Sequence, residues 1–277
     1  AAHRDLHSFP TRRSSDLRAA DLEAVLGECR PDVVFHLAAN ASVPLSVERP
    51  AWDFETNCLG TVRVLDGVRR LCPAARVVFA SSGAVYGEPS RFPIAEDDPL
   101  APISPYGFSK LAAEMQCRMA HRLHGVDVVI ARLFNTYGPR MPRFVVLDFL
   151  RKLRRDPTRL EILGTGRQVR DFTHVADTVA GLMRLAGRGC AGGAYNVASG
   201  RARSVTDLAG DLLRILGLEG TTRLEFTQAS WPGDAQRWEV DVSRLAALGY
   251  CAGVTMEEGL GSVIRWFDAL PGAAAQP

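Results

Sequence analysis

The 277-residue sequence lacks the patterns that mark several protein classes. Its six cysteines are scattered, form no C-x-x-C pair and share no metal-like spacing with histidine, so we expect reduced thiols and no metal site. No apolar run approaches the length of about 18 residues that a membrane-spanning helix needs. The formal net charge is only +2, which provides no basic field for nucleic acid. Composition therefore predicts a cytoplasmic protein with neither nucleic-acid nor membrane partners.

Residues 1–17 differ in composition and periodicity from the rest of the chain. They are polar, rich in arginine and serine, and free of helical or strand periodicity. They also lack the apolar centre of a secretory signal. We interpret them as a segment foreign to the protein.

Apolar runs and helical periods alternate from Arg18 onward. Buried strands are predicted at 32–39, 75–81 and 126–134. Helices are predicted at 19–29, 52–71 and 106–123. Such alternation is typical of βαβ units. The pattern predicts an α/β fold with a Rossmann-like, doubly wound parallel sheet over residues 18–140.

The alternation of predicted strands and helices becomes less regular after Gly138. Helices are predicted at 144–155, 174–186, 205–216 and 257–270. Short strands are predicted at 160–163, 194–198 and 223–226. We expect residues 141–277 to form mainly a smaller α/β lobe, interleaved with the last sheet elements. It would cover the carboxyl ends of the sheet strands, where open α/β sheets bind ligands.

A serine, a tyrosine and a lysine form the strongest chemical pattern. Ser82 follows a buried strand, and Tyr106 and Lys110 are four residues apart on one helix face. A nearby ammonium favours a phenolate and lowers the tyrosine pKa. Such a trio can take a proton from a carbinol while a hydride leaves its carbon, with a cofactor carrying the hydride. Taken singly, a Y-x-x-x-K pair also fits a solvated helix surface.

Several further motifs occur in a fixed order. They are HLAA (36–39), NCLGT (57–61), SSGAVYG (81–87), SPYGFSK (104–110), RLFNTYGPR (132–140), GTGRQVRDFTHVAD (164–177), YNVASG (195–200) and PGD (232–234). With them the chain resembles the extended short-chain dehydrogenase/reductases, specifically the NAD-dependent nucleotide-sugar epimerase/dehydratase group. The resemblance runs from about Arg18 to Leu270.

The resemblance implies roles for individual residues. Tyr106 would be the general base, Lys110 its pKa-lowering partner and ribose contact, and Ser82 the third catalytic residue. The implied NAD contacts are Leu37, Ala38, Ala39, Asn57, Ser81, Tyr106, Lys110 and Phe134. The implied contacts to a nucleotide-diphosphate sugar are Ser82, Asn135, Arg170, Asp234, Arg237 and Trp238.

Two of these residues also fit simpler interpretations. Asn135 could be a turn residue, and Arg170 could form a surface ion pair with Asp171. The family further implies a homodimer through the 106–123 helix, where Leu111, Met115 and Met119 recur at helical spacing.

Two small residues favour epimerisation within this family. Dehydratases and decarboxylases carry an acidic residue just before V-Y-G, and dehydratases often carry a second, whereas Gly83 and Ala84 stand here. Loss of water needs an acid to protonate the leaving hydroxyl. We therefore expect a UDP-glucose 4-epimerase-like activity. A nucleotide-sugar reductase or another NAD(P)-dependent oxidoreductase of the same family is the alternative.

The substrate end departs from the family pattern. The galactose-type epimerases have an arginine where Trp231 stands, so Arg237 or Arg170 would have to supply the phosphate-binding charge. Trp238 occupies a position whose size correlates with acceptance of an N-acetyl group. Its bulk favours a plain hexose, with ordinary packing as the other interpretation.

The glycine-rich turn that should open such a fold is missing from this sequence. Before Asp32 the sequence contains one glycine, Gly27, and no G-x-x-G-x-x-G or G-x-G-x-x-G. We therefore expect the first βαβ unit to be absent and the NAD-binding domain to be incomplete. A non-catalytic fragment unable to bind NAD is the competing hypothesis.

Overall fold

The computed structural model describes residues 19–228 and 235–270. The segment 1–17 and Asp234 lie outside the described residues.

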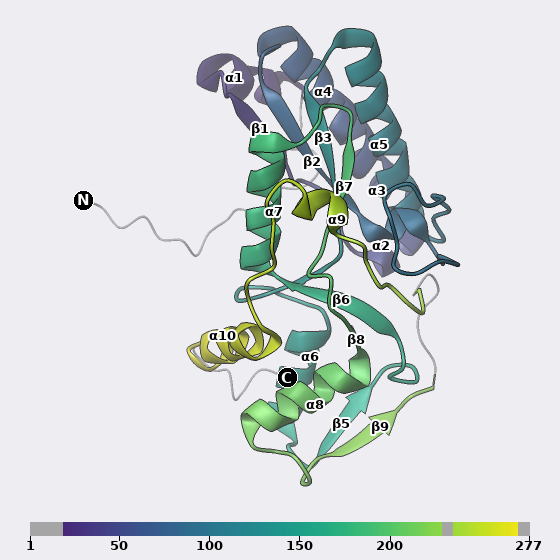
Figure 1. Ribbon diagram of the computed structural model, residues 1–277, viewed down its shortest axis with the longest axis vertical. Coiled ribbons are helices and arrows are strands. Elements are labelled where there is room, and N and C mark those ends of the chain that lie inside the picture. Colours follow the sequence, from purple (N-terminus) through teal and green to yellow (C-terminus); the bar gives the residue numbers. More distant parts are fainter. Residues whose placement is uncertain (1–18, 229–234, 271–277) are drawn as a thin grey trace, which may run out of the picture.

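Four parallel strands form the main sheet, as the sequence predicted (Figure 1). Their order is β1 (Val33–His36), β2 (Arg76–Ser82), β3 (Val128–Leu133) and β7 (Ala194–Val197). The register pairs Phe79 with Ile130 and Leu133 with Val197. β2 and β3, which are rich in valine and isoleucine, suit their central place because both of their faces are buried. β1, which we also expected to be buried, is only partly so, because it lies at the edge of the described sheet and leaves Phe35 37% exposed.

Helices cover both faces of this sheet, which confirms the doubly wound arrangement. Val77 and Phe79 point into a core with α1 (Ala19–Cys29), α4 (Gly60–Leu71) and α5 (Pro105–His124). Val78, between them in sequence, points into the opposite core with α7 (Val175–Arg188) and α9 (Ser243–Ala246). The alternation follows from the period of two in a β-strand.

The expected 52–71 helix is longer and less regular than predicted. It is preceded by α2 (Val43–Glu48), begins with α3 (Pro50–Phe54), and passes through a π-helical turn at Glu55–Leu59 before α4. Single π-turns inside helices are frequent at functional sites. Asn57 and Cys58 are buried in this turn.

A second group of elements occupies the lower half of Figure 1. Its helices are α6 (Val145–Arg155), α8 (Val205–Leu216) and α10 (Met256–Asp268). Its two-stranded parallel sheet pairs β5 (Arg159–Ile162) with β9 (Arg223–Phe226). These elements share one hydrophobic core, centred on Leu150, Leu212 and Leu260.

The small sheet at the boundary of the two groups was not predicted. It contains β4 (Asn135–Tyr137), β6 (Val169–His174) and β8 (Ala202–Ser204). β4 and β8 have three residues each, and all three strands carry polar side chains, so neither length nor alternation revealed them. This sheet nevertheless positions Asn135 and Arg170.

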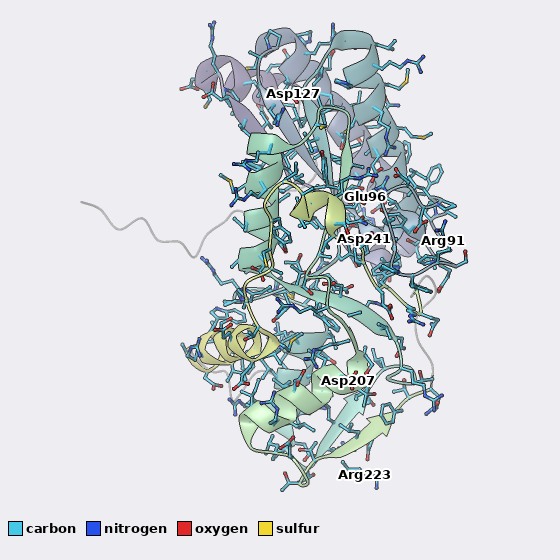
Figure 2. All side chains as sticks on the ribbon, in the orientation of Figure 1. Arg91, Glu96, Asp127, Asp207, Arg223 and Asp241 are labelled. Carbon is cyan, nitrogen blue, oxygen red and sulfur yellow. The ribbon has the colours of Figure 1, made fainter. Side chains whose placement is uncertain are left out.

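Local caps account for helix boundaries that the sequence predicted well. Asp207 lies in the first turn of α8 (Figure 2). Its backbone N donates to Ser204 Oγ (3.0 Å), and its carboxylate accepts from Ser204 N (3.2 Å). The same capping box, formed by Thr255 and Glu258, opens α10. Each box satisfies backbone N–H groups that would otherwise have no partner.

Candidate active site

A cavity of about 290 Å³ lies at the carboxyl edge of the main sheet. Residues from the ends of β1, β2 and β3 line it, and so do residues from β4, α5 and the start of α6. Ser82, Tyr106 and Lys110 all reach this cavity, so the structure brings the predicted trio together. A larger hollow of about 760 Å³ beside Gly166 contains none of the three.

The N-terminal turn of α5 sets the place of Tyr106. Ser104 caps the helix by accepting from Gly107 N (3.1 Å), and Tyr106 N donates to Ser46 Oγ (3.1 Å). A Cβ on Gly107 would lie 2.6 Å from the carbonyl oxygen of Ala84. Only glycine at that position lets α5 approach the 3-10 turn Gly83–Tyr86 so closely.

The electrostatics of Tyr106 differ from our expectation. Burial raises the pKa of Tyr106 above its ordinary value, because an enclosed phenolate loses its solvation. A hydrogen bond with Ser82 and the charge of Arg143 partly lower it, whereas the charge of Asp53 raises it. Lys110, which we expected to lower this pKa, is not among the groups that shift it.

Lys110 is a buried ammonium with spare hydrogen-bonding capacity. Its Nζ donates to the carbonyl oxygen of Ala80 (2.8 Å) and lies 5.1 Å from the centroid of the Phe79 ring. Burial lowers its pKa to about 8, against the raising effect of nearby negative charge. Its only hydrogen bond among the described residues uses one N–H, so two remain for a ligand.

The two strand-end serines have different surroundings. Ser81 Oγ donates to Glu114 Oε1 (2.6 Å) and is buried. Ser82 Oγ accepts from Ala84 N (3.2 Å) and faces the cavity. The hydroxyl of Ser82 is therefore open to the cavity beside Tyr106, whereas the hydroxyl of Ser81 is already engaged within the protein.

Aromatic rings form one wall of the cavity. Phe134 packs between Tyr86, with ring centroids 6.2 Å apart, and Trp238, at 5.8 Å and a perpendicular angle. Trp238 Nε1 donates to the carbonyl oxygen of Gly87 (3.3 Å), which fixes the indole. Asn135 lies beside this wall, and its buried Oδ1 has no hydrogen-bond partner within the described structure. A buried amide oxygen of this kind is available to a ligand donor.

Asn135 and Arg170 do not fit the simpler interpretations. Asn135 lies in β4 rather than in a turn. Arg170 and Asp171 are both buried, so a surface ion pair is excluded. Arg170 donates to the backbone carbonyl oxygens of Val169 and Ala235, and its guanidinium lies 5.1 Å from the centre of the Trp238 ring.

Only some of the other residues predicted to contact the cofactor or the substrate line the cavity. Leu37 and Ala39 line the cavity, as do Ser81 and Phe134, whereas Ala38 is absent from its wall. Arg237 is half exposed, pairs with Glu239 (2.5 Å) and is also absent from the wall.

Asn57 lies behind the cavity and is bonded within the protein. It is buried, accepts from Asn40 N (2.8 Å), and donates to Asp53 Oδ1 (3.1 Å) and Ser109 Oγ (3.0 Å). Its side chain is therefore a connector between segments rather than part of the cavity wall.

Sequence reasoning missed residues that act on Tyr106 from outside the motifs. Arg143 lowers the pKa of Tyr106, and its neighbour Phe144 lines the cavity with a left-handed backbone (φ 80°). Such backbone strain in a non-glycine residue is concentrated at functional sites. The unusual torsion angle of Phe144 has no signature in the sequence.

A buried network of hydrogen bonds links the strands and the helix that carry the candidate trio. Arg132 forms two hydrogen bonds with Glu114 (3.0 and 2.8 Å) and one with Tyr86 Oη (2.7 Å). Tyr86 in turn donates to Asn196 Oδ1 (2.7 Å). Glu114 also accepts from Ser81. The network therefore ties β2, β3 and α5 together directly beneath the candidate trio.

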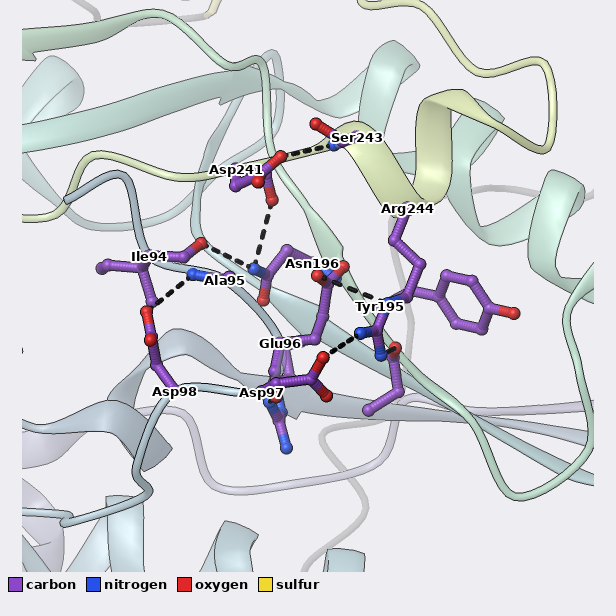
Figure 3. Close-up of polar contacts among 12 residues, drawn as sticks. Ile94, Ala95, Glu96, Asp97, Asp98, Tyr195, Asn196, Asp241, Ser243 and Arg244 are labelled. Carbon is purple, nitrogen blue, oxygen red and sulfur yellow. Dashed lines mark hydrogen bonds and ion pairs between the residues drawn. The ribbon is translucent and has the colours of Figure 1, made fainter. Parts of the chain in front are cut away.

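The far end of this network fixes the loop that contains Glu96. Figure 3 shows Asn196 donating through Nδ2 to the carbonyl oxygens of Ile94 (3.0 Å) and Asp241 (3.2 Å). Its backbone N–H donates to Glu96 Oε1 (2.9 Å), and Arg244 pairs with the same carboxylate (3.6 Å). These bonds hold the 94–98 loop against β7 and α9.

A sequence model described as the NAD dependent epimerase/dehydratase family matches residues 2–198. The chain belongs to this family. The UDP-glucose 4-epimerase of Mycolicibacterium smegmatis is 34% identical over 259 residues, covering 91% of this chain and 81% of the relative. The dTDP-glucose 4,6-dehydratase of Streptomyces griseus is also 34% identical, covering 85% of this chain and 71% of the relative.

Solved structures of the epimerase/dehydratase family share the fold. The UDP-glucose 4-epimerase of Thermotoga maritima, solved with UDP-glucose, has a TM-score of 0.84 at 30% identity and covers 93% of this chain and 83% of its own. The UDP-glucuronic acid 4-epimerase of Bacillus cereus, in complex with UDP-glucuronic acid and NAD, has a TM-score of 0.81 at 28% identity, covering 91% and 79%. Epimerases and dehydratases are thus both similar to the chain.

The described part of the chain contains neither a metal-ion cluster nor a membrane-spanning helix. No three histidine, cysteine, aspartate or glutamate side chains there are grouped to hold a metal ion. Within residues 19–228 and 235–270, no helix combines the length and apolar character needed to cross a bilayer.

Proposed function

We propose that the protein is an NAD-dependent nucleotide-sugar 4-epimerase, with a UDP-hexose as substrate. The observation that carries the proposal is the chemistry of the cavity wall. Its described lining includes the hydroxyls of Ser82 and Tyr106 and the ammonium of Lys110, but no carboxylate. Such a wall can accept and return a proton, but it offers no carboxylic acid to protonate a leaving hydroxyl.

Steric contacts keep an acid out of one position that dehydratases use. A Cβ on Gly83 would lie 2.5 Å from Cε1 of Phe134, whose ring is held between Tyr86 and Trp238. A side chain of any kind at position 83 would therefore displace the aromatic wall. This constraint supports epimerisation over dehydration.

The residues around the trio fit the nicotinamide end of the cofactor. Lys110 has two free N–H donors for ribose hydroxyls, and Leu37, Ala39 and Phe134 provide apolar surface for a flat ring. NAD, when bound, supplies the acceptor and donor of the hydride at the sugar C4.

In the proposed reaction, three side chains handle the proton and the oxygen. Tyr106 takes the proton of the C4 hydroxyl and later returns it, while Ser82 hydrogen-bonds the same oxygen. This step needs Tyr106 as a phenolate, and the ammonium of Lys110 on the same cavity wall is placed to favour that form against the effect of burial. Asn135, with its unpaired Oδ1, is placed to accept a hydrogen bond from a sugar hydroxyl.

The proposal has a direct test in the products. Incubation of the chain with NAD and UDP-glucose is expected to give UDP-galactose, detected by proton NMR. Tyr106→Phe removes the proton acceptor and should lower the rate by about 100-fold or more. A 4-keto-6-deoxy product would refute the assignment.

Trp238 suggests a preference for a plain hexose. The indole lines the cavity, contacts Phe134 and donates to the carbonyl oxygen of Gly87, so turning it aside to admit an N-acetyl group would break both interactions. UDP-glucose should therefore compete better than UDP-N-acetylglucosamine. Equal inhibition constants for the two would contradict this preference.

Binding of the cofactor is tested separately from turnover by isothermal calorimetry with NAD. Micromolar binding supports the epimerase, and no binding at millimolar NAD would contradict it.

We also propose a homodimer formed through the exposed face of α5. Four apolar side chains of α5 are exposed there, namely Phe108, Met115, Met119 and Leu123. Exposed apolar rows of this kind mark interaction surfaces. Leu111, which we expected on this face, packs instead against the cluster that contains Tyr86 and Phe134.

A further inference from the structure

Asp53, on α3, is a buried carboxylate close to the candidate trio. Its side chain is fully enclosed, with 0% of the residue exposed. Oδ1 accepts hydrogen bonds from Asn40 Nδ2 (2.6 Å) and Asn57 Nδ2 (3.1 Å). Oδ2 accepts from Ser109 Oγ (2.6 Å). No arginine or lysine of the described chain forms a direct salt bridge with it, so neutral donors alone satisfy the carboxylate.

Ser109 connects this carboxylate to the turn of α5 that matters for chemistry. It lies between Tyr106 and Lys110 in sequence, and its Oγ is also within 2.9 Å of the carbonyl oxygen of Tyr106. Asn57 donates to the same hydroxyl. Movement of this turn would therefore break bonds to two elements outside α5.

The charge of Asp53 is the largest favourable electrostatic influence on Lys110. Burial lowers the pKa of Lys110, and Asp53, ahead of Cys117 and Glu114, raises it. From β1, His36 faces the same ammonium, whose charge helps to lower the pKa of His36 to about 4. The charge of Asp53 also raises the pKa of Tyr106, so it bears on both groups.

We propose that Asp53 is a positioning residue of the active site. Through Ser109 it anchors the α5 turn that carries Tyr106 and Lys110, and its negative charge favours the ammonium form of Lys110. The role rests on the proposed use of Tyr106 and Lys110, but its test needs no turnover.

The chain is suited to a direct measurement because it contains only two lysines, Lys110 and Lys152. Lys152 lies on the surface of α6 and pairs with Asp148 (2.8 Å), so Lys152→Arg keeps its charge and its partner. In that background, ¹³C-lysine labelling leaves Lys110 as the single lysine signal in an NMR titration. In this background, with Asp53 and Ser109 unchanged, the ammonium of Lys110 should titrate near pH 8.

Two variants separate charge from anchoring. Asp53→Asn removes the charge while its amide can still donate to Ser109 Oγ, so the pKa of Lys110 should fall by about one unit. Ser109→Ala keeps the charge and removes the bond. It should leave the Lys110 pKa unchanged but increase amide hydrogen exchange in the first two turns of α5.

The outcomes are distinct. An unchanged Lys110 pKa in Asp53→Asn, or an equal fall in both variants, would overturn the charge role. Unaltered exchange in Ser109→Ala would overturn the anchoring role. Asp53→Ser serves as a second charge-removing variant if the amide perturbs folding. A chain that shows these shifts but no epimerisation would refute the proposed function and leave the role of Asp53 intact.

Discussion

Replacing Glu114 by glutamine tests the buried network beneath the site. Glu114 and Arg132 have exposed side-chain fractions of 0% and 1%, and they share two hydrogen bonds of 3.0 and 2.8 Å. Glu114→Gln conserves shape but leaves the buried guanidinium without its counter-charge. Breaking one partner of a buried pair costs about 3–5 kcal/mol.

That loss should be visible in thermal unfolding. For a chain of this size, about 1 kcal/mol corresponds to roughly 2–4 °C, so Tm should fall by roughly 10 °C. The assay is a calorimetric or circular-dichroism melt, with urea titration for the free energy of unfolding. Asp66→Asn is the matched control. Asp66 is likewise a carboxylate that accepts hydrogen bonds from arginine, here Arg69 and Arg70, but it lies on the surface. It should cost less than about 1 kcal/mol.

A double variant distinguishes an unpaired charge from damaged packing. Glu114→Gln alone leaves the buried charge of Arg132 unpaired. Adding Arg132→Met removes that charge, so part of the lost stability should return. A loss of stability in Glu114→Gln as small as that in Asp66→Asn would contradict an unpaired buried charge. So would a double variant that loses as much stability as Glu114→Gln and Arg132→Met lose when measured separately and added.

Three further predictions address other parts of the molecule. Burial holds the pKa of His36 near 4, below its unfolded value of 6.5, so only the unfolded chain takes up this proton as pH falls. The free energy of unfolding should therefore drop by about 2 kcal/mol between pH 7 and pH 5 on account of this group, and His36→Gln should abolish that share. Gly83→Ala should cost about 1–3 kcal/mol because its Cβ would meet the Phe134 ring at 2.5 Å, whereas Gly27→Ala, with nothing within 4 Å, should be neutral or stabilising in urea titrations. Met119→Glu, on the exposed face of α5, should convert the proposed dimer to a monomer in light scattering, and an unchanged mass would exclude this face as the interface.

The main sheet could be predicted because its signal is local and strong. The runs that became β2 and β3 are apolar on both faces, and the helices between them keep a clear period. Helices with capping boxes were also well predicted, and α8 has the bounds that the sequence indicated. In these places pattern and capping agree with the tertiary structure.

The boundary sheet could not be predicted because tertiary pairing creates it. Asn135 and Phe172 become neighbours only when β4 pairs with β6, and nothing within three residues of polar sequence requires this. Motif order did place Ser82, Tyr106 and Lys110 at one site. It could not indicate that Asp53 reaches α5 through Ser109, since the two are 56 residues apart.

The raised pKa of Tyr106 was missed for a related reason. Spacing put an ammonium one helical turn away, but burial, which only the fold determines, raises the pKa of Tyr106, and Lys110 is not among the groups that offset it. The sequence can therefore predict which side chains share a site, but their pKa values depend on how deeply the fold buries them.

The fate of the hydrogen on C4 tests the central claim most directly. UDP-glucose carrying deuterium at C4 would be incubated with the chain and NAD, and the products examined by NMR and mass spectrometry. The account predicts that deuterium stays at C4 of the UDP-galactose formed, because the hydride returns to the carbon that it left. Deuterium at C6 of a 4-keto-6-deoxy sugar, or on released cofactor, would contradict it.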